Sequence, residues 1–133
     1  MSFRILGLDP APFLPLYGLG DAELARRGAR RCIADSKPGY PDRIELRDAE
    51  PGEALLLLNH AHLPGDGPYR SSHAIFVREG ATHGFNAVDE IPEALRVRML
   101  SVRAFDADDM MLDAELVDGR QLESCIARLL APA

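Results

Sequence analysis

Short apolar segments alternate with polar and turn-forming residues along most of the chain, and their spacing predicts a series of β-strands. The segment 43–47 alternates Ile44 and Leu46 with charged neighbours, which is the pattern of a half-buried strand. The segment 54–58 is apolar without alternation, as expected for an inner strand that is covered on both faces. The remaining predicted strands are 3–8, 31–34, 74–77, 100–105 and 110–117.

Helices are predicted from capping residues and from one apolar stripe. Asp21 is a suitable N-cap for a short helix that ends at residue 29, and Pro92 suits the first turn of a second helix. Before the last helix, Asp118 and Gln121 form a capping box, in which the carboxylate accepts the N3 amide and the side-chain amide reaches back. That helix carries a core-facing stripe of Leu122, Cys125, Ile126, Leu129 and Leu130.

The strands 100–105 and 110–117 are joined by the acidic segment 106–109 and are expected to form a hairpin. On the second strand the apolar residues Leu112, Ala114 and Leu116 share one face, opposite Asp113 and Glu115. Strands and helices do not alternate regularly. The predicted class is therefore α+β, with a mainly antiparallel or mixed sheet of about six to seven strands and about two to three helices. A length of 133 residues fits a single domain, 1–133.

Composition and charge limit the classes of molecule that this chain is expected to bind. With 47% hydrophobic and 27% charged residues, the chain has the make-up of a globular protein that needs no disulfide or metal to fold. The net charge of −6 argues against nucleic acid as a partner, because phosphate backbones are bound by clustered Lys and Arg. A local basic group has the pattern of a solvated face and consists of Arg26, Arg27, Arg30 and Arg31.

The chain is expected to be cytoplasmic and to have no membrane partner. Its longest apolar run, 54–58, is far too short to span a bilayer, and its first residues do not form a signal peptide. Cys32 and Cys125 lie far apart without metal-ligand spacing, which favours free thiols in a reducing compartment. No cofactor is predicted from these features.

Two apolar strands are separated by the polar segment 59–73, which is long for a connection in a compact domain. Loops of this length are usually functional or disordered. If the two strands pair as antiparallel neighbours, both ends of the segment meet at one end of the sheet. His60, His62 and residues 69–73 would then lie close together, so this segment is the candidate site.

The candidate site has the residue types that bind an anion. Arg70 presents a planar fork of donors that matches a carboxylate or phosphate, and neighbouring hydroxyl groups add adaptable donors. A histidine could add charge or move a proton near neutral pH. The candidate ligand-binding residues for this anionic small molecule are His62, Tyr69, Arg70, Ser71, Ser72 and His73. The competing interpretation is structural: Arg70 ties the loop to a nearby carboxylate, and the serines satisfy turn amides.

The residues of the same segment are also consistent with two other functions, metal binding and acid–base catalysis. In the first, His60, His62 and His73 bind zinc or another divalent metal and leave one position open, although ordinary loop histidines would give the same pattern. In the second, the domain is an enzyme in which His62 or His73 is the acid–base and Arg70 orients the substrate. The sequence contains no GxSxG, GxxxxGK[ST] or EF-hand motif that would indicate a particular reaction.

The candidate segment also carries a family resemblance. The sequences LLLNHAH at 56–62 and PYRSSHAIFVRE at 68–79 are similar to those of the bacterial domain of unknown function 1203 family. The likeness extends to FRILGLD at 3–9 and to LSVRAFDA at 100–107, with a Met-Met pair shortly afterwards. The family has no assigned activity, so the resemblance places the candidate residues in a family-like stretch without giving them a role.

The chain departs from the family pattern at two places. Family members have Pro-Cys-Arg where this chain has Pro41-Asp42-Arg43, which weakens any thiol mechanism there. They also continue past the last helix into another strand, whereas this sequence stops at Ala133. A missing strand would leave a sheet edge for a partner chain to cover. A homodimer, or a protein–protein interaction module without a pocket, is therefore the third functional alternative.

Overall fold

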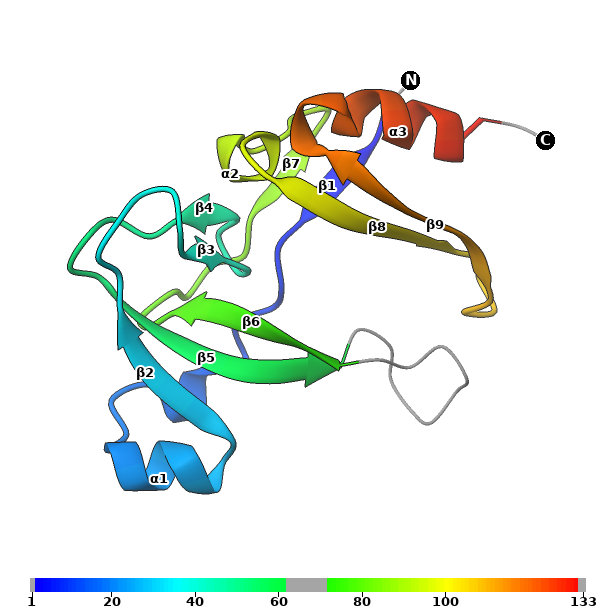
Figure 1. The fold of residues 1–133 in the computed structure, drawn as a ribbon. Helices are drawn as coiled ribbons and strands as arrows, with labels where there is room; N and C mark the ends of the chain where they lie inside the picture. The colour runs from blue at the N-terminus through cyan, green and yellow to red at the C-terminus, as the bar shows by residue number, and fades with distance from the viewer. Residues whose placement is uncertain (1, 62–71, 132–133) are drawn as a thin grey trace.

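The computed structural model describes residues 2–61 and 72–131 of the chain (Figure 1). In these residues nine strands form three sheets, accompanied by three α-helices and two short 3-10 helices. The predicted α+β class is therefore confirmed. The strands exceed the predicted number because the segment 41–48 holds two very short strands, and because the hydrophobic pattern does not reveal the strand at 86–88.

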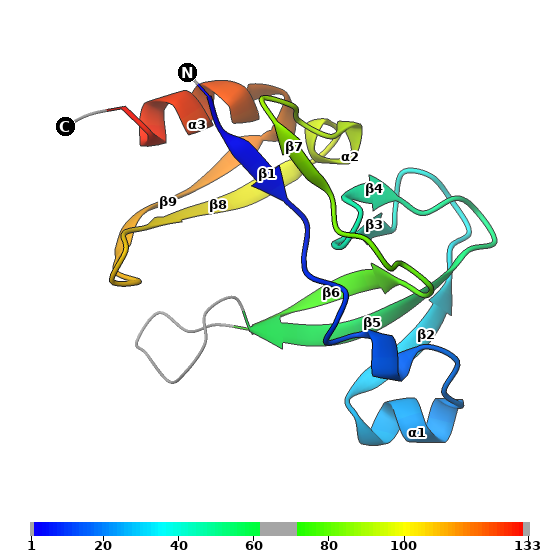
Figure 2. The same cartoon turned by 180° about the vertical axis from the view of Figure 1, so that it is seen from behind.

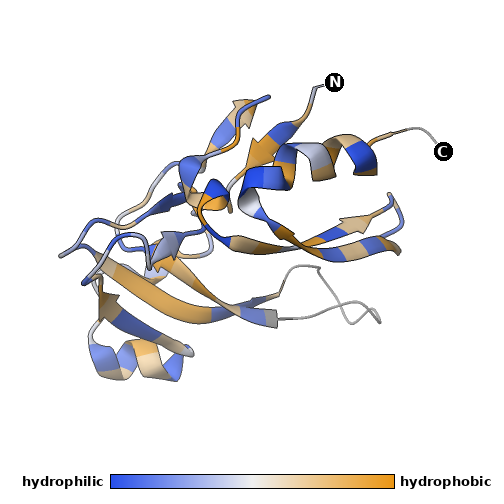
Figure 3. Ribbon diagram, turned by 45° about the horizontal axis from the view of Figure 1, so that its top comes forward, coloured by the Kyte–Doolittle hydropathy of each residue, from blue (hydrophilic) through white to orange (hydrophobic). Residues whose placement is uncertain are grey.

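The largest sheet has five strands in the order β2-β5-β6-β3-β4. Its strands are β2 (Ala29–Ile33), β3 (Pro41–Asp42), β4 (Arg47–Asp48), β5 (Ala54–Ala61) and β6 (Ser72–Arg78). Neighbouring strands are antiparallel except β3 and β6, which are parallel, so the sheet is mixed. β5 is an inner strand, as its unbroken apolar run predicts, and Figure 3 shows this hydrophobic run along the sheet. Leu55 and Leu56, on its two faces, are both fully buried.

One face of this sheet packs against the N-terminal part of the chain. Phe13 and Leu16 come from the region of a 3-10 helix (Leu14–Leu16), and Leu24 comes from α1 (Asp21–Arg26). The buried residues of this core are Phe13, Leu16, Leu24, Ala29, Ile44, Leu56, Ile75, Val77 and Ala81. Because side chains alternate along a strand, Leu58 and His60 follow Leu56 on the same face of β5. The core face of the sheet therefore ends in polar side chains.

The segment 43–47 is not the strand that its alternation predicts. It forms the turn between β3 and β4, with Arg47 already in β4. The carboxylate of Asp42 accepts the N–H groups of Ile44 and Glu45 at 3.0 Å each, which closes the turn. Leu46 then adopts a positive φ of 52°. The alternation was misleading because the apolar side chains of the turn are buried, just as those of a half-buried strand would be.

The remaining strands and helices form a second layer above the sheet (Figures 1 and 2). β1 (Arg4–Leu6) pairs antiparallel with β7 (Asn86–Val88). β8 (Met99–Phe105) and β9 (Met111–Asp118) form the hairpin that the sequence predicts. Together with α2 (Glu93–Arg96) and α3 (Leu122–Leu129), these strands enclose a separate core. Its buried residues are Ile91, Val117, Leu122 and Cys125.

The helices lie close to their predicted positions, but their ends differ. α1 has Gly20 as its N-cap rather than Asp21, and it ends at Arg26 rather than at residue 29. A positive φ of 75° at Gly28 turns the chain away after α1. α2 follows Pro92, as predicted.

At the last helix, the predicted capping box is only partly present. Asp118 does act as a cap, but its carboxylate accepts the N–H of Arg120 at 2.9 Å rather than that of Gln121. The reason is that a 3-10 helix (Gly119–Gln121) precedes α3 and tightens the first turn. On the stripe of α3, Leu130 is 53% exposed because the helix has already ended there.

On β9 the predicted alternation is present, but its apolar face is the outer one. Leu112 is 67% exposed and Leu116 is 71% exposed. The inner face of the hairpin is supplied mainly by Leu100 and Val102 of β8, which pack on the second core. The outer face of the hairpin therefore exposes large hydrophobic side chains to solvent.

Among the described residues, no helix combines the length and the apolar character needed to cross a membrane.

Candidate functional site

β5 and β6 are antiparallel neighbours, which is the condition that the sequence argument required. Their register places His60 directly opposite His73, at the end where the polar segment begins and ends. His62, Tyr69, Arg70 and Ser71 lie outside the described residues, and the position of the Ser72 side chain is not described. Their predicted roles therefore stay predictions, and the geometry of the site rests on its described neighbours.

The two histidines lie on the face of the sheet that covers the N-terminal core. Residues directly opposite each other on an antiparallel pair have their Cβ atoms about 4.5–5.5 Å apart. His60 is half-buried, and its ring lies 5.9 Å from the ring of Phe13, at an interplanar angle of 50°. His73 is exposed. Along β5, the core face of the sheet therefore changes from the packed side chains of Leu56 and Leu58 to the pair His60 and His73.

Arg43 is the next residue of interest, and it lies beside β6 on the side that faces away from β5. It follows β3 directly, its N–H donates to the carbonyl of Phe76 at 3.0 Å, and its own carbonyl accepts the N–H of Leu8 at 2.8 Å. The backbone of Arg43 is thereby fastened to β6 on one side and to the N-terminal segment on the other. Its side chain is half-buried, and burial lowers its pKa.

The guanidinium of Arg43 makes no hydrogen bond or ion pair with any of the residues that the structure describes. Other half-buried arginines are neutralised: Arg31 by Glu79, Arg78 by Glu45 and Arg98 by Asp48. A partly dehydrated cation without a counter-charge is unfavourable unless it acquires an anionic partner. Arg43 therefore differs from these arginines in having no neutralising carboxylate among the described residues, as expected of a residue that binds an anion.

The charge of Arg43 also affects His60. The pKa of His60 is lowered from its usual value, first by burial and then by the positive charge of Arg43. Both effects oppose protonation of His60.

This electrostatic arrangement bears on the metal alternative. A divalent cation next to His60 would be repelled by Arg43, whereas an anion would be attracted. In residues 2–61 and 72–131 no group of three or more His, Cys, Asp or Glu side chains could hold a metal ion. The three-histidine site includes His62, which lies outside these residues, so it stays a prediction that the local charge disfavours.

Sequence reasoning missed Arg43 because it was assigned to an ordinary strand. The pattern carried no signal for its burial, because in an alternating strand the residue next to a buried Ile44 would face solvent. What the sequence could not indicate is that β3 would lie beside β6, which places Arg43 next to Phe76 on the side of β6 that faces away from β5.

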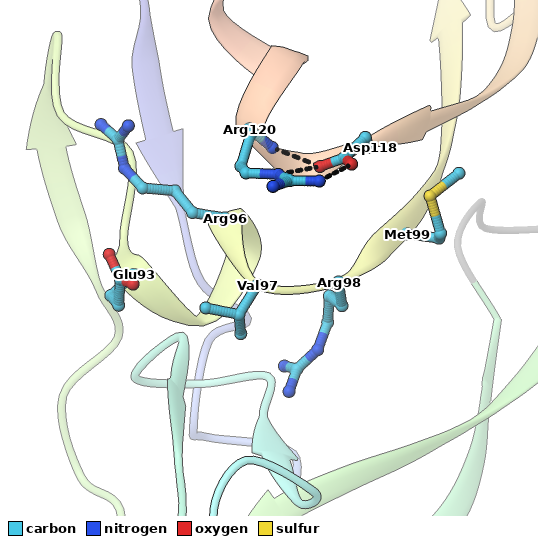
Figure 4. Close-up of a pocket in the computed structure, with 7 residues that line it drawn as sticks. All are labelled: Glu93, Arg96, Val97, Arg98, Met99, Asp118 and Arg120. Carbon is cyan, nitrogen blue, oxygen red and sulfur yellow. Dashed lines mark hydrogen bonds and ion pairs between the residues drawn. The ribbon is translucent and has the colours of Figure 1, made fainter.

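A hollow of about 450 Å³ lies between α2, the start of β8, and the end of β9 with the 3-10 helix that follows it (Figure 4). Its lining residues are Glu93, Arg96, Val97, Arg98, Met99, Asp118 and Arg120. Arg120 already binds Asp118 through Nε at 3.1 Å and Nη2 at 2.7 Å. Arg98 binds Asp48 at 2.7 Å, and Figure 4 shows it pointing away from Arg120. Arg98 and Arg120 each bind a carboxylate and do not converge, which makes this hollow the weaker candidate for an anion, although Nη1 of Arg98 is buried without a hydrogen-bond partner among the described residues.

The fold and the site define an α+β protein with a mixed sheet that carries an imidazole pair at the end of β5 and β6 and, beside β6, an arginine without a counter-charge among the described residues. A family model described as "Protein of unknown function (DUF1203)" matches residues 39–133, which is more than half of the chain. The chain belongs to this family. The match includes Arg43, His60 and His73, whereas the resemblance predicted at 3–9 lies outside it. Neither the curated proteins nor the solved structures contain a significant match.

Proposed function

We propose that this protein binds a small anionic molecule at the end of the β5–β6 pair, with Arg43 as the principal charged contact. The observation that carries the proposal is the half-buried guanidinium of Arg43, which has no counter-charge among the described residues. An arginine fork suits carboxylate and phosphate oxygens, because it donates two parallel hydrogen bonds. An incoming anion would also relieve the unfavourable charge that the fold holds there.

The predicted loop residues extend this proposal. Tyr69, Arg70, Ser71 and Ser72 would add donors around the same ligand, and His62 or His73 would add charge or a proton. These contributions are predictions from the sequence alone. The enzymatic version, with His62 or His73 as the acid–base, uses the same residues and requires turnover as an additional finding.

Replacing Arg43 by Met is expected to abolish thermal stabilisation by small anions. In the wild type, an anion at about one hundred times its dissociation constant adds about 2.7 kcal/mol, which raises the melting temperature by several degrees. Met keeps the apolar stem of the side chain and removes the donors. The measurement is a thermal-shift series with sulfate, phosphate and simple carboxylates.

The matched control for this experiment is Arg30→Met. Arg30 also lacks a partner among the described residues, but it is exposed on β2, so its loss removes the same charge without touching the site. Arg70→Ala tests the predicted loop in the same assay. Equal stabilisation of the wild type and Arg43→Met by the same anions would contradict the proposal, and equal losses in both Met variants would indicate only a general charge effect.

A second candidate function is self-association through the outer face of the β8–β9 hairpin. The supporting observation is the exposure of large apolar side chains there: 56% for Met99, 67% for Leu112 and 71% for Leu116. Contiguous apolar patches on a protein surface mark interaction sites or aggregation-prone regions. A second copy of the chain is the occupant that this candidate names.

Replacing Leu116 by Lys is expected to convert a dimer into a monomer if this face is the interface. The charge would be buried without a partner at the contact, which typically weakens an interface by several kcal/mol. Sedimentation velocity measures the change. Leu6→Lys is the control, because Leu6 is 61% exposed on β1, away from the hairpin. A wild type that sediments as a monomer at all concentrations would exclude this candidate.

A further inference from the structure

We infer that two copies of this chain associate through the free edge of β9, so that their β8–β9 hairpins join into one antiparallel sheet of four strands. This inference rests on the second candidate function, self-association at the hairpin, and it specifies the contact. It does not depend on the anion site at Arg43.

One edge of β9 is unpaired. β8 and β9 form a sheet of two strands, and no third strand among the described residues joins it. The strand is open to solvent along much of its length, because Leu112, Asp113, Ala114 and Leu116 are all exposed. An exposed edge strand presents a row of N–H and C=O groups on which another chain can form a ladder of hydrogen bonds.

The hydrogen bonds of the hairpin show which residues face the free edge. The N–H of Gly119 donates to the carbonyl of Arg98 on the other side of the hairpin at 2.8 Å. In an antiparallel pair, every second residue turns its backbone groups toward the partner strand, so those of Ala114 and Leu116 point away from β8. In agreement with this alternation, the N–H of Ala114 donates to Oδ1 of its neighbour Asp113 at 2.8 Å.

The sequence of β9 suits pairing with a second copy. Residues 112–116 read Leu-Asp-Ala-Glu-Leu, so the order of apolar and acidic residues is the same in both directions from Ala114. An antiparallel pair centred on Ala114 places it opposite the partner's Ala114, with Leu116 beside the partner's Leu112. The exposed leucines of the two copies then cover each other on the outer face of the joined sheet. Because each copy contributes the same surface, the contact closes as a symmetric dimer.

Two features keep this pairing weak. Asp113 lies opposite the partner's Glu115, and like charges in this position are unfavourable. Arg128 offsets part of the repulsion, because it forms an ion pair with Glu115. A bulge also leaves Leu112 without a partner on β8, and bulges bend a strand and interrupt its ladder. We therefore expect a dimer that dissociates on dilution.

Sedimentation velocity of the full chain over a range of concentrations measures this dimer. Ala114→Pro removes the central N–H and should weaken association by about tenfold or more, because two symmetric hydrogen bonds are lost. That N–H points away from β8, so the hairpin itself should tolerate the proline. The matched control is Ala107→Pro at the second position of the turn closed by Asp106 and Asp109, where proline is favoured, and it should leave the dimer unchanged.

Asp113→Ala should tighten the dimer by about threefold or more, because it removes the like charge and frees the N–H of Ala114 for the partner strand. Asp108→Ala removes the same charge from the turn and should change the dissociation constant little. Ala114→Cys should form a disulfide between two copies under mild oxidation, since residues of a hydrogen-bonded pair have Cα atoms about 5.5 Å apart. Ala107→Cys should not, and it controls for the two native cysteines.

The outcomes separate the contact from the association itself. A dimer that persists in Ala114→Pro but is lost in Leu116→Lys, or that gives no cross-link in Ala114→Cys, would overturn this inference and leave the outer face as the interface. Circular dichroism checks that the proline variant is folded, and the cross-link reports on the contact without it. A wild type that is monomeric at every concentration would overturn both this inference and the second candidate function.

Discussion

Replacing Asp42 by Ala should lower the free energy of unfolding by about 3 to 5 kcal/mol. The carboxylate is fully buried and accepts three backbone N–H groups, from Ile44, Glu45 and Arg78, at 3.0 Å each. A buried N–H that loses its partner costs about 1 to 3 kcal/mol. Urea denaturation followed by circular dichroism measures the difference.

Asp42→Asn is the informative control. The remaining carbonyl oxygen can still accept the N–H groups of Ile44 and Arg78, which both point to Oδ1, whereas the N–H of Glu45 loses the acceptor Oδ2. Burial also raises the pKa of Asp42, so an uncharged side chain avoids a desolvation cost that the carboxylate bears. We therefore expect Asn to fall between the wild type and Ala. An Ala variant within about 1 kcal/mol of the wild type would contradict this account.

The loss of Asp42 should also affect the candidate site. Asp42 ties the turn after β3 to the N–H of Arg78 on β6, and Arg43 follows it directly in the chain. When that tie is broken, the backbone that presents Arg43 is held less firmly, so anion affinity should fall in Asp42→Ala more than in Asp42→Asn. The thermal-shift series proposed for Arg43 measures both variants.

Gly7→Ala is expected to destabilise the protein by about 2 kcal/mol or more, because the added Cβ has no room. It would stand 1.8 Å from the carbonyl oxygen of Ile44 and 3.1 Å from the backbone nitrogen of Phe85. Both neighbours are backbone atoms, so rotation of a side chain cannot relieve the contact. The chain would have to separate at the place where Gly7 donates to Phe85 and Phe85 donates to Ile44.

Gly20→Ala is the matched control, since a Cβ there meets nothing within 4 Å and the backbone φ is −70°. Its expected cost is below about 1 kcal/mol and comes only from the poorer N-cap that Ala provides. Thermal and urea denaturation of the two variants should therefore differ clearly. Similar stabilities of Gly7→Ala and Gly20→Ala would show that the close approach of the chains at Ile44 is not maintained in solution.

The two substitutions act on the same junction from different sides. Gly7 lets the N-terminal segment approach the turn at Ile44, and Asp42 holds that turn against β6. Arg43 stands between them, with its carbonyl bound to Leu8 and its N–H bound to Phe76. Stability and the position of the candidate ligand group therefore depend on the same few contacts.

Several elements were predictable because their signals are local. The hairpin of β8 and β9 follows from two alternating segments and a short acidic connection, and α3 follows from its apolar stripe. The inner position of β5 follows from its unbroken apolar run. In each case the residues that specify the element lie within it, so no distant contact was needed.

The turn at 43–46 was not predictable, because its cause lies outside the pattern. Its alternation matches that of a strand, but the carboxylate of Asp42 binds the turn's own N–H groups and a strand from more than thirty positions away. The direction of the apolar face of β9 was likewise not given by its alternation, and in the structure this face is the exposed one. Alternation identifies two faces, and only packing decides which of them meets the core.

For the candidate site, the sequence by itself determined that a polar segment with histidines at both ends connects two apolar strands. The register of β5 and β6 in the structure then places His60 opposite His73. It also supplied the family, through residues 39–133. Only the tertiary structure showed that Arg43 lies beside β6, next to this strand pair. The parallel pairing of β3 with β6 brings together residues distant in the chain, and burial takes the guanidinium partly out of water. Local patterns encode strands and turns, whereas the charge balance of a site depends on which elements lie beside one another.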